Sequence, residues 1–170
     1  LVEFFLKEGS HAIKAHGSSL ESVNALKARL ESNDLTFDEI EYWIQDFLRD
    51  EPRWKFPDFS RIDVIIHCAA LTSVRKGILE NYEKYFKVNV LTPKILTKKA
   101  LDERISHFIH YSTGQIYGHA PTYPITELTP RRPINIYGAT KLMGEVAVSS
   151  LGMSGLKYSI LRLFSVCGKH

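Results

Sequence analysis

The sequence predicts an α/β protein built on a doubly wound parallel sheet of the Rossmann type. Three apolar runs have the length and composition of strands, at residues 61–70, 107–118 and 156–166. One helical run separates the first strand from the second, and another separates the second from the third. This alternation is typical of right-handed crossovers that lay strands parallel in one sheet, where chemistry collects at the carboxyl ends of the strands.

The first third of the chain has weaker patterns. Residues 1–9 are expected to form a helix with a glycine cap, and residues 10–15 a strand. A helix should follow over about residues 20–30. Residues 36–39 have the form of a capping box, which predicts a further amphipathic helix. Apolar residues follow that box at helical spacing: Ile40, Trp43, Ile44 and Phe47.

The later elements are better defined. The run 61–70 is apolar on both faces and ends in small residues, which predicts a central parallel strand. The next helix contains Pro93, which has no N–H to donate to the carbonyl of Asn89 and should distort the helix there. The strand that begins at residue 107 runs into a hydroxyl-rich loop that starts with Ser112 and Thr113.

Tyr137 and Lys141 form a candidate acid/base pair. Residues four apart share one face of a helix, so an ammonium can lie near a phenol and stabilise the phenolate. That would lower the tyrosine pKa from about 10 towards working pH, as proton transfer to or from a hydroxyl requires. The alternative is an ordinary pair on a helix surface.

The surrounding motifs favour the catalytic interpretation. They are Asp63-Val-Ile-Ile-His-Cys-Ala69-Ala70, Val88-Asn89-Val90, Ser112-Thr113 with Ile116-Tyr117-Gly118, Tyr137-x-x-x-Lys141, and Arg162-Leu-Phe-Ser-Val-Cys-Gly168. In order and spacing they resemble the extended short-chain dehydrogenase/reductase family, in its nucleotide-sugar epimerase/dehydratase branch. The resemblance covers nearly the whole chain.

This resemblance implies roles for individual residues. Thr113, Tyr137 and Lys141 would be catalytic, with Thr113 bonding the reacting oxygen; Thr113 could alternatively satisfy a loop amide. Lys141 and Tyr137 would also bind the nicotinamide cofactor. The other cofactor-binding residues implied by the resemblance are Asp34, Leu35, Ala69, Ala70, Asn89 and Phe164.

The cofactor is expected to be NAD or NADP. Members that prefer NAD carry an acidic residue after the second strand, where this chain has His16-Gly17-Ser18-Ser19. The missing carboxylate slightly favours NADP, and the alternative is a simple polar turn. The family's Gly-x-x-Gly-x-x-Gly loop, which binds the diphosphate, is missing from the sequence. Residues 1–170 are therefore expected to be one partial cofactor domain of a larger enzyme, without its substrate domain.

The reaction type is expected to be epimerisation or ketone reduction at C4 of a nucleotide sugar. Dehydratases of this branch carry an Asp-Glu pair after the catalytic hydroxyl, and here the two positions are Gly114 and Gln115. Neither residue transfers protons at neutral pH. The rival hypothesis is a binding module of the same fold that is catalytically incomplete.

Charge and hydropathy exclude some classes of binding partner. A net charge of +3 with no basic run argues against nucleic acid, and no apolar run reaches transmembrane length. The expected partner is a nucleotide-sugar substrate, with a cytoplasmic location and a homodimeric full-length protein. Cys68 and Cys167 are expected to be reduced, buried thiols, with a disulfide as the alternative. The histidines show no metal-binding pattern, so no metal site is expected.

Overall fold

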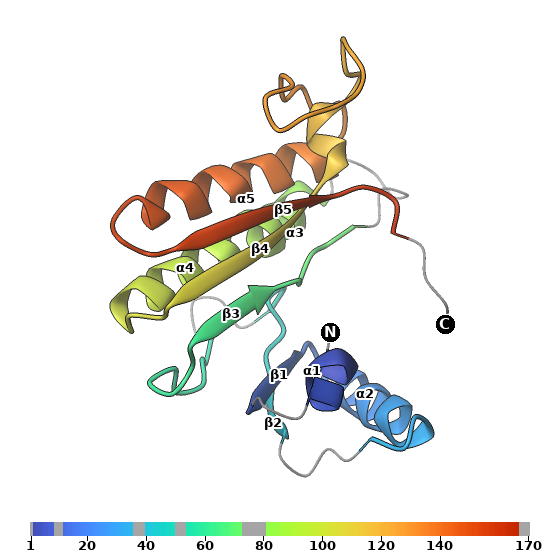
Figure 1. Cartoon of the computed structure of the whole chain (residues 1–170), viewed down its shortest axis with the longest axis vertical. Coiled ribbons are helices and arrows are strands. Elements are labelled where there is room, and N and C mark those ends of the chain that lie inside the picture. The colour runs from blue at the N-terminus through green and yellow to red at the C-terminus, as the bar shows by residue number, and fades with distance from the viewer. Residues whose placement is uncertain (1, 9–11, 36–39, 50–53, 73–80, 167–170) are drawn as a thin grey trace. The chain divides into compact units, whose positions relative to one another are not determined.

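The computed structural model describes residues 2–8, 12–35, 40–49, 54–72 and 81–166 (Figure 1). Its contacts group into two compact units, residues 1–58 and 59–170. Each unit contains a parallel sheet with flanking helices, which confirms the predicted fold class. The assignment of residues 1–170 to one partial domain stays a prediction.

The first unit is a two-stranded parallel sheet with two helices. Its elements are α1 (Val2–Glu8), β1 (Ile13–Gly17), α2 (Leu20–Ser32) and β2 (Ile40–Ile44). The register places Ile13 opposite Ile40 and Gly17 opposite Ile44. Its hydrophobic core consists of Ala15, Leu30 and Ile40, on which α1 and α2 pack apolar side chains.

The helix predicted after residue 39 is wrong, because residues 40–44 form β2. The sequence Ile-Glu-Tyr-Trp-Ile is rich in β-branched and aromatic residues, which pack well on a pleated strand. Pairing with β1 buries Ile40 in the core. Trp43 lies against His16 of β1, with ring centroids 4.7 Å apart. Tertiary packing on β1 therefore overrides the helical spacing, and the expected capping box at 36–39 lies outside the described residues.

The second unit carries the predicted strand–helix alternation. Its elements are β3 (Val64–His67), α3 (Tyr82–Phe86), a π-helical turn η1 (Lys87–Leu91), α4 (Thr92–Asp102), β4 (His107–Thr113), a 3₁₀ turn η2 (Gly114–Tyr117), α5 (Ile136–Gly152) and β5 (Tyr158–Leu163). The three strands are parallel in the order β3-β4-β5. In the described sheet β4 is therefore the central strand, and the central place predicted for residues 61–70 is wrong. Val64 is 45% exposed, as suits an edge strand.

Helices α4 and α5 lie side by side on one face of this sheet (Figure 1). The residues of β4 that point to that face are buried: Phe108, His110 and Ser112. Their neighbours His107, Ile109 and Tyr111 point the other way and are half-buried. The period of two along β4 therefore decides which side chains lie under α5.

The helix irregularity predicted at Pro93 is confirmed. The segment before the proline is the π turn η1, in which the amide of Thr92 donates to the carbonyl of Lys87, five residues back. Pro93 is in the first turn of α4, directly after η1, so the irregular turn lies immediately before the proline.

Candidate functional site

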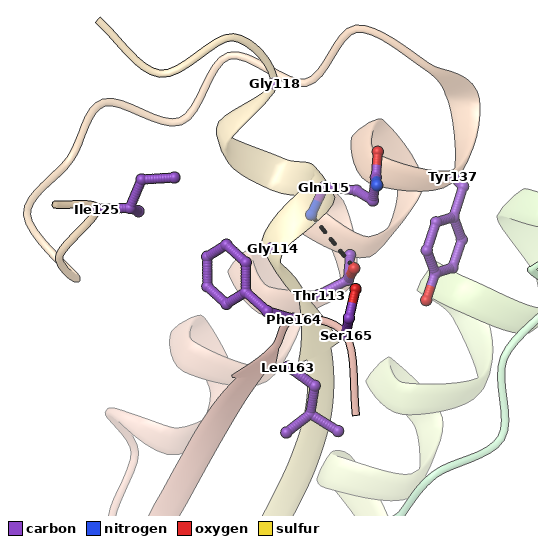
Figure 2. Close-up of a pocket in the computed structure, with 9 residues that line it drawn as sticks. All are labelled: Thr113, Gly114, Gln115, Gly118, Ile125, Tyr137, Leu163, Phe164 and Ser165. Carbon is purple, nitrogen blue, oxygen red and sulfur yellow. Dashed lines mark hydrogen bonds between the residues drawn. The ribbon is translucent and has the colours of Figure 1, made fainter. Parts of the chain in front are cut away.

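A pocket of about 400 Å³ lies at the carboxyl ends of β4 and β5 (Figure 2). The loop η2, the start of α5 and the segment after β5 form its walls. Its lining residues are Thr113, Gly114, Gln115, Gly118, Ile125, Tyr137, Leu163, Phe164 and Ser165. Two of the three residues predicted to be catalytic, Thr113 and Tyr137, thus lie in one pocket at the expected edge of the sheet.

Tyr137 is in the first turn of α5, which the side chain of Asn135 caps by accepting from the amide of Gly138 at 2.7 Å. Figure 2 shows the Tyr137 ring extending from this turn on the side of the pocket where Thr113 lies. Burial raises the pKa of Tyr137, and the Thr113 side chain, a hydrogen-bonding neighbour of the phenol, opposes that rise. The phenol is therefore neutral at pH 7, whereas the sequence predicted a lowered pKa.

Thr113 has two neighbours at once. Its hydroxyl accepts from the amide of Gln115 at 3.2 Å, which starts the 3₁₀ turn η2, and it also influences Tyr137. The loop-amide contact, one of the two alternatives from the sequence, is therefore present, and the catalytic role of Thr113 stays a prediction. Adjacent Ser112 lies on the opposite face of β4, under α5, and has no hydrogen-bond partner among the described residues.

Lys141 is buried, with 1% of its surface exposed. Its ammonium donates to the carbonyl of Tyr111 at 2.5 Å. Burial lowers its pKa to about 8, and the charges of Glu145 and Cys68 partly oppose that fall. Because the ammonium turns to the backbone of β4, its charge does not lower the pKa of Tyr137 in this arrangement.

Asn89 connects three segments of the second unit. Its side chain accepts from the amide of Leu71 at 2.9 Å and donates to the carbonyl of the same residue at 3.1 Å. It also donates to the hydroxyl of Thr140 on α5 at 3.0 Å. Asn89 therefore fixes the segment after β3, in which Ala69 and Ala70 are half-buried and small.

Gly114 and Gln115 are both constrained by neighbours. A Cβ on Gly114 would lie 2.6 Å from the ring of Phe164, so the ring occupies the place of a side chain. Phe164 is 58% exposed and stacks on Tyr117 with ring centroids 6.2 Å apart. Gln115 accepts from the side-chain amide of Asn135 at 3.0 Å. Neither position offers an acid to the pocket.

The predicted cofactor-binding residues Asp34 and Leu35, and the segment His16-Gly17-Ser18-Ser19, belong to the first unit, which is described by itself. Asp34 is exposed in the turn after α2 with a φ of +54°, and Leu35 packs against the core of that unit. His16 donates to the carbonyl of Gln45 at 2.9 Å, and Ser19 caps α2. Since His16 and Ser19 already have these partners, the structure gives no support to a preference for NADP.

An ion pair that no sequence pattern predicted joins β5 to α5. The guanidinium of Arg162 on β5 donates to both carboxylate oxygens of Glu145 on α5, at 2.9 to 3.2 Å. It also donates to the hydroxyl of Tyr117 at 2.9 Å and to the carbonyl of Glu127 at 3.2 Å. The sequence signals that could have indicated it are an arginine inside an apolar strand and a glutamate one turn after Lys141.

The remaining sequence predictions concern the cysteines, metal binding and membrane spans. Cys68 is a free thiol, but it is exposed because it follows the last residue of β3, so its predicted burial is wrong. Cys167 lies outside the described residues. Within the described ranges, no three His, Cys, Asp or Glu side chains are grouped to hold a metal ion. No helix in those ranges has the length and hydropathy to cross a membrane.

Comparison with known proteins agrees with this geometry. The model of the NAD-dependent epimerase/dehydratase family matches residues 2–170. The chain is 30% identical over 174 aligned positions to a UDP-glucose 4-epimerase of Lactobacillus helveticus, covering 94% of this chain and 49% of the relative. It is 30% identical over 130 positions to a dTDP-4-dehydrorhamnose reductase of Burkholderia thailandensis, covering 74% and 41% of the two chains.

A solved structure of a nucleotide-sugar epimerase is also similar to this chain. The UDP-Glc/GlcNAc 4-epimerase of Campylobacter jejuni superposes with a TM-score of 0.74 at 25% identity, over 95% of this chain and 48% of that one. The chain thus spans about half the length of the proteins it matches. The resemblance inferred from the motifs is confirmed, and the chain belongs to the NAD-dependent epimerase/dehydratase family.

Proposed function

We propose that this chain carries the acid/base residues of an NAD-dependent enzyme that epimerises or reduces a nucleotide sugar at C4. The observation that carries the proposal is the meeting of Tyr137 and Thr113 in one pocket, with Lys141 one helical turn further along α5. The family match and the 4-epimerase relatives support it.

The chain's own residues suit the cofactor. Lys141 uses one N–H on Tyr111, and a remaining N–H can donate to a hydroxyl of a ribose. Ala69 and Ala70 are small side chains at the carboxyl end of β3, where a flat ring system can approach the backbone. Bound NAD would supply the acceptor for the hydride that leaves C4 of the sugar.

Tyr137 would transfer the proton. With its pKa raised by burial, the phenol is protonated at pH 7 and can donate to the oxygen of a C4 ketone. Removal of a proton from a C4 hydroxyl needs the opposite shift, which a closer approach of the Lys141 ammonium would provide. Thr113 would hold the reacting oxygen beside the phenol.

Gly114 and Gln115 favour epimerisation or reduction over dehydration. Elimination of water from a 4-keto sugar needs a positioned acid at the leaving oxygen. Position 114 has no side chain and is covered by the Phe164 ring, and the Gln115 amide does not ionise and is bonded to Asn135. Among the described residues that line the pocket, none is therefore a carboxylic acid that could serve this step.

The test uses the product of the complete reading frame that encodes this chain, incubated with NAD and UDP-glucose, UDP-galactose or dTDP-glucose. Mass spectrometry and sugar chromatography should show interconversion at C4, or reduction of a supplied 4-keto sugar. A steadily formed product lighter by one water would overturn the assignment. Tyr123→Phe is a matched control for Tyr137→Phe, because Tyr123 is 79% exposed.

The second candidate is a binding module that retains the cofactor fold without turnover. The raised pKa of Tyr137 and the contact of Lys141 with the backbone favour it. The two candidates differ in one measurement. A module would change the fluorescence of NADH on binding and give no sugar product with any of the three substrates.

A further inference from the structure

His110 is a buried polar side chain that the proposed reaction does not use. It lies in the middle of β4 with 0% of its surface exposed. Neither of its ring nitrogens has a hydrogen-bond partner among the described residues. A neutral imidazole has one donor and one acceptor, so His110 has two unmet hydrogen-bonding groups inside the protein.

Ser112 adds a third unmet group on the same face of β4. It follows His110 by two residues, so both side chains point under α5. Its hydroxyl is buried and also has no partner in the described part of the chain. The ring of His67 stacks on the other side of His110 with centroids 5.3 Å apart.

Lys141 lies above this polar cluster. An ideal Cβ on Gly144 would lie 3.6 Å from Nε2 of His110, and Gly144 is one turn beyond Lys141 on α5. The ammonium of Lys141 bonds the carbonyl of Tyr111, the residue between His110 and Ser112. Burial, together with the nearby charge of Lys141, lowers the pKa of His110 to about 3, so the imidazole is neutral at pH 7.

Leaving these groups unpaired would be costly. A buried polar group without a partner costs about 1 to 3 kcal/mol, and native proteins avoid this by enclosing a water with two to four polar neighbours. Here the unpartnered atoms of His110 and Ser112 lie on the face of β4 that α5 covers, and Lys141 of α5 bonds the carbonyl of the residue between them. An apolar residue at position 110 would fill the same volume without this cost, so packing does not account for the histidine.

We propose that His110 and Ser112 hold a buried water that accepts a hydrogen bond from Lys141, which makes His110 a positioning residue for that ammonium. The functional importance of Lys141 rests on the proposed function. The water site itself does not, because it depends only on the geometry of β4 and α5.

The water would stabilise the charged form of Lys141, so its loss should lower the pKa of the lysine below about 8. Other groups also act on this ammonium. Glu145 on α5 and Cys68 after β3 raise its pKa, and His67 faces the far side of His110. They are unchanged in a variant at position 110, so a comparison of variants isolates the effect of the histidine.

The experiment is an NMR titration of the lysine side chains in the whole chain, without substrate or cofactor. In His110→Phe the pKa of Lys141 should fall by about one unit, because a charge-assisted hydrogen bond is worth that much. His110→Gln keeps a donor and an acceptor and should restore at least half of the shift. His107→Phe is the matched control, since His107 points to the opposite face of β4 and lies 2.9 Å from the hydroxyl of Ser159.

A pKa of Lys141 that is unchanged or raised in His110→Phe would overturn the proposal. If that variant does not fold, the wild-type protein still decides. Cross-relaxation between a long-lived water and the ring protons of His110 supports the site, and its absence refutes it. Since neither measurement uses turnover, failure of the water site and failure of the proposed function are distinguishable.

Discussion

The buried ion pair between Glu145 and Arg162 allows a quantitative prediction for Glu145→Gln. The side chains are 2% and 16% exposed, and three of the guanidinium's hydrogen bonds reach the carboxylate. Breaking a buried pair typically costs 3 to 5 kcal/mol, because the remaining charge is left without its partner. Since Arg162 keeps some exposure and its contact with Tyr117, we expect Glu145→Gln to lower the free energy of unfolding by about 2 to 4 kcal/mol.

The assay is urea unfolding followed by far-ultraviolet circular dichroism. Fluorescence is unsuitable, since Trp43 and Trp54 are the two tryptophans and both belong to the first unit. Replacing both charged residues, in Glu145→Met with Arg162→Met, should cost less than the sum of the two single changes, by about 2 kcal/mol.

Asp102→Asn is the control for the ion pair. Asp102 pairs with Lys98 on α4, but the two side chains are 53% and 58% exposed, so its loss should cost less than about 1 kcal/mol. A loss below about 1 kcal/mol for Glu145→Gln, or additive effects in the double variant, would refute the reasoning. Because Glu145 raises the pKa of Lys141, the same variant should also lower that pKa below about 8.

The other predictions concern the pocket, pH and the cofactor. Tyr137→Phe should reduce turnover by about 10² to 10⁴ while Tyr123→Phe does not, and a Tyr137→Phe enzyme with half of the wild-type rate would exclude the tyrosine as proton carrier. The pKa of His110 is about 3 when folded and 6.5 as its ordinary value, so the unfolded chain binds more protons between these pH values. The free energy of unfolding should therefore fall as the pH drops below 6.5, by up to about 1.4 kcal/mol per unit from this group, and His110→Phe should remove that slope in urea titrations. Residues 1–170 contain no Gly-x-x-Gly-x-x-Gly loop and should bind NAD weakly, so tight binding in isothermal titration would contradict this expectation.

The sequence predicted the second unit well because its hydrophobic patterns are long and each fits only one type of secondary structure. The apolar strand at residue 107 and the helix with Tyr137 and Lys141 lie where they were expected, and Pro93 marks the π turn. The first unit was harder to predict. Residues 40–47 satisfy both a helical and a strand pattern, and only pairing with β1 decides between them.

The sequence predicted which residues form the site, but it did not predict all of their contacts. Spacing on a helix placed Lys141 near Tyr137 in sequence, but a carbonyl of β4 competes for the ammonium. Such competition depends on the distance between α5 and β4, which no local pattern reports. The partners of Gly114 and Gln115, Phe164 and Asn135, are likewise distant in sequence.

The π turn η1 determines the direction in which the side chains that follow it point from the helix. Each residue advances an α-helix by about 100°, and the extra residue in a π turn shifts every later side chain by one such step. Within the turn Asn89 points to Leu71 and Thr140, and after the turn Leu96 and Ala100 point to the buried side of α4. Deleting one residue would give a more regular helix, yet it would rotate one of these two sets away from its partners. The irregular turn thus lets one segment serve a polar contact and an apolar core that a regular helix would present in different directions.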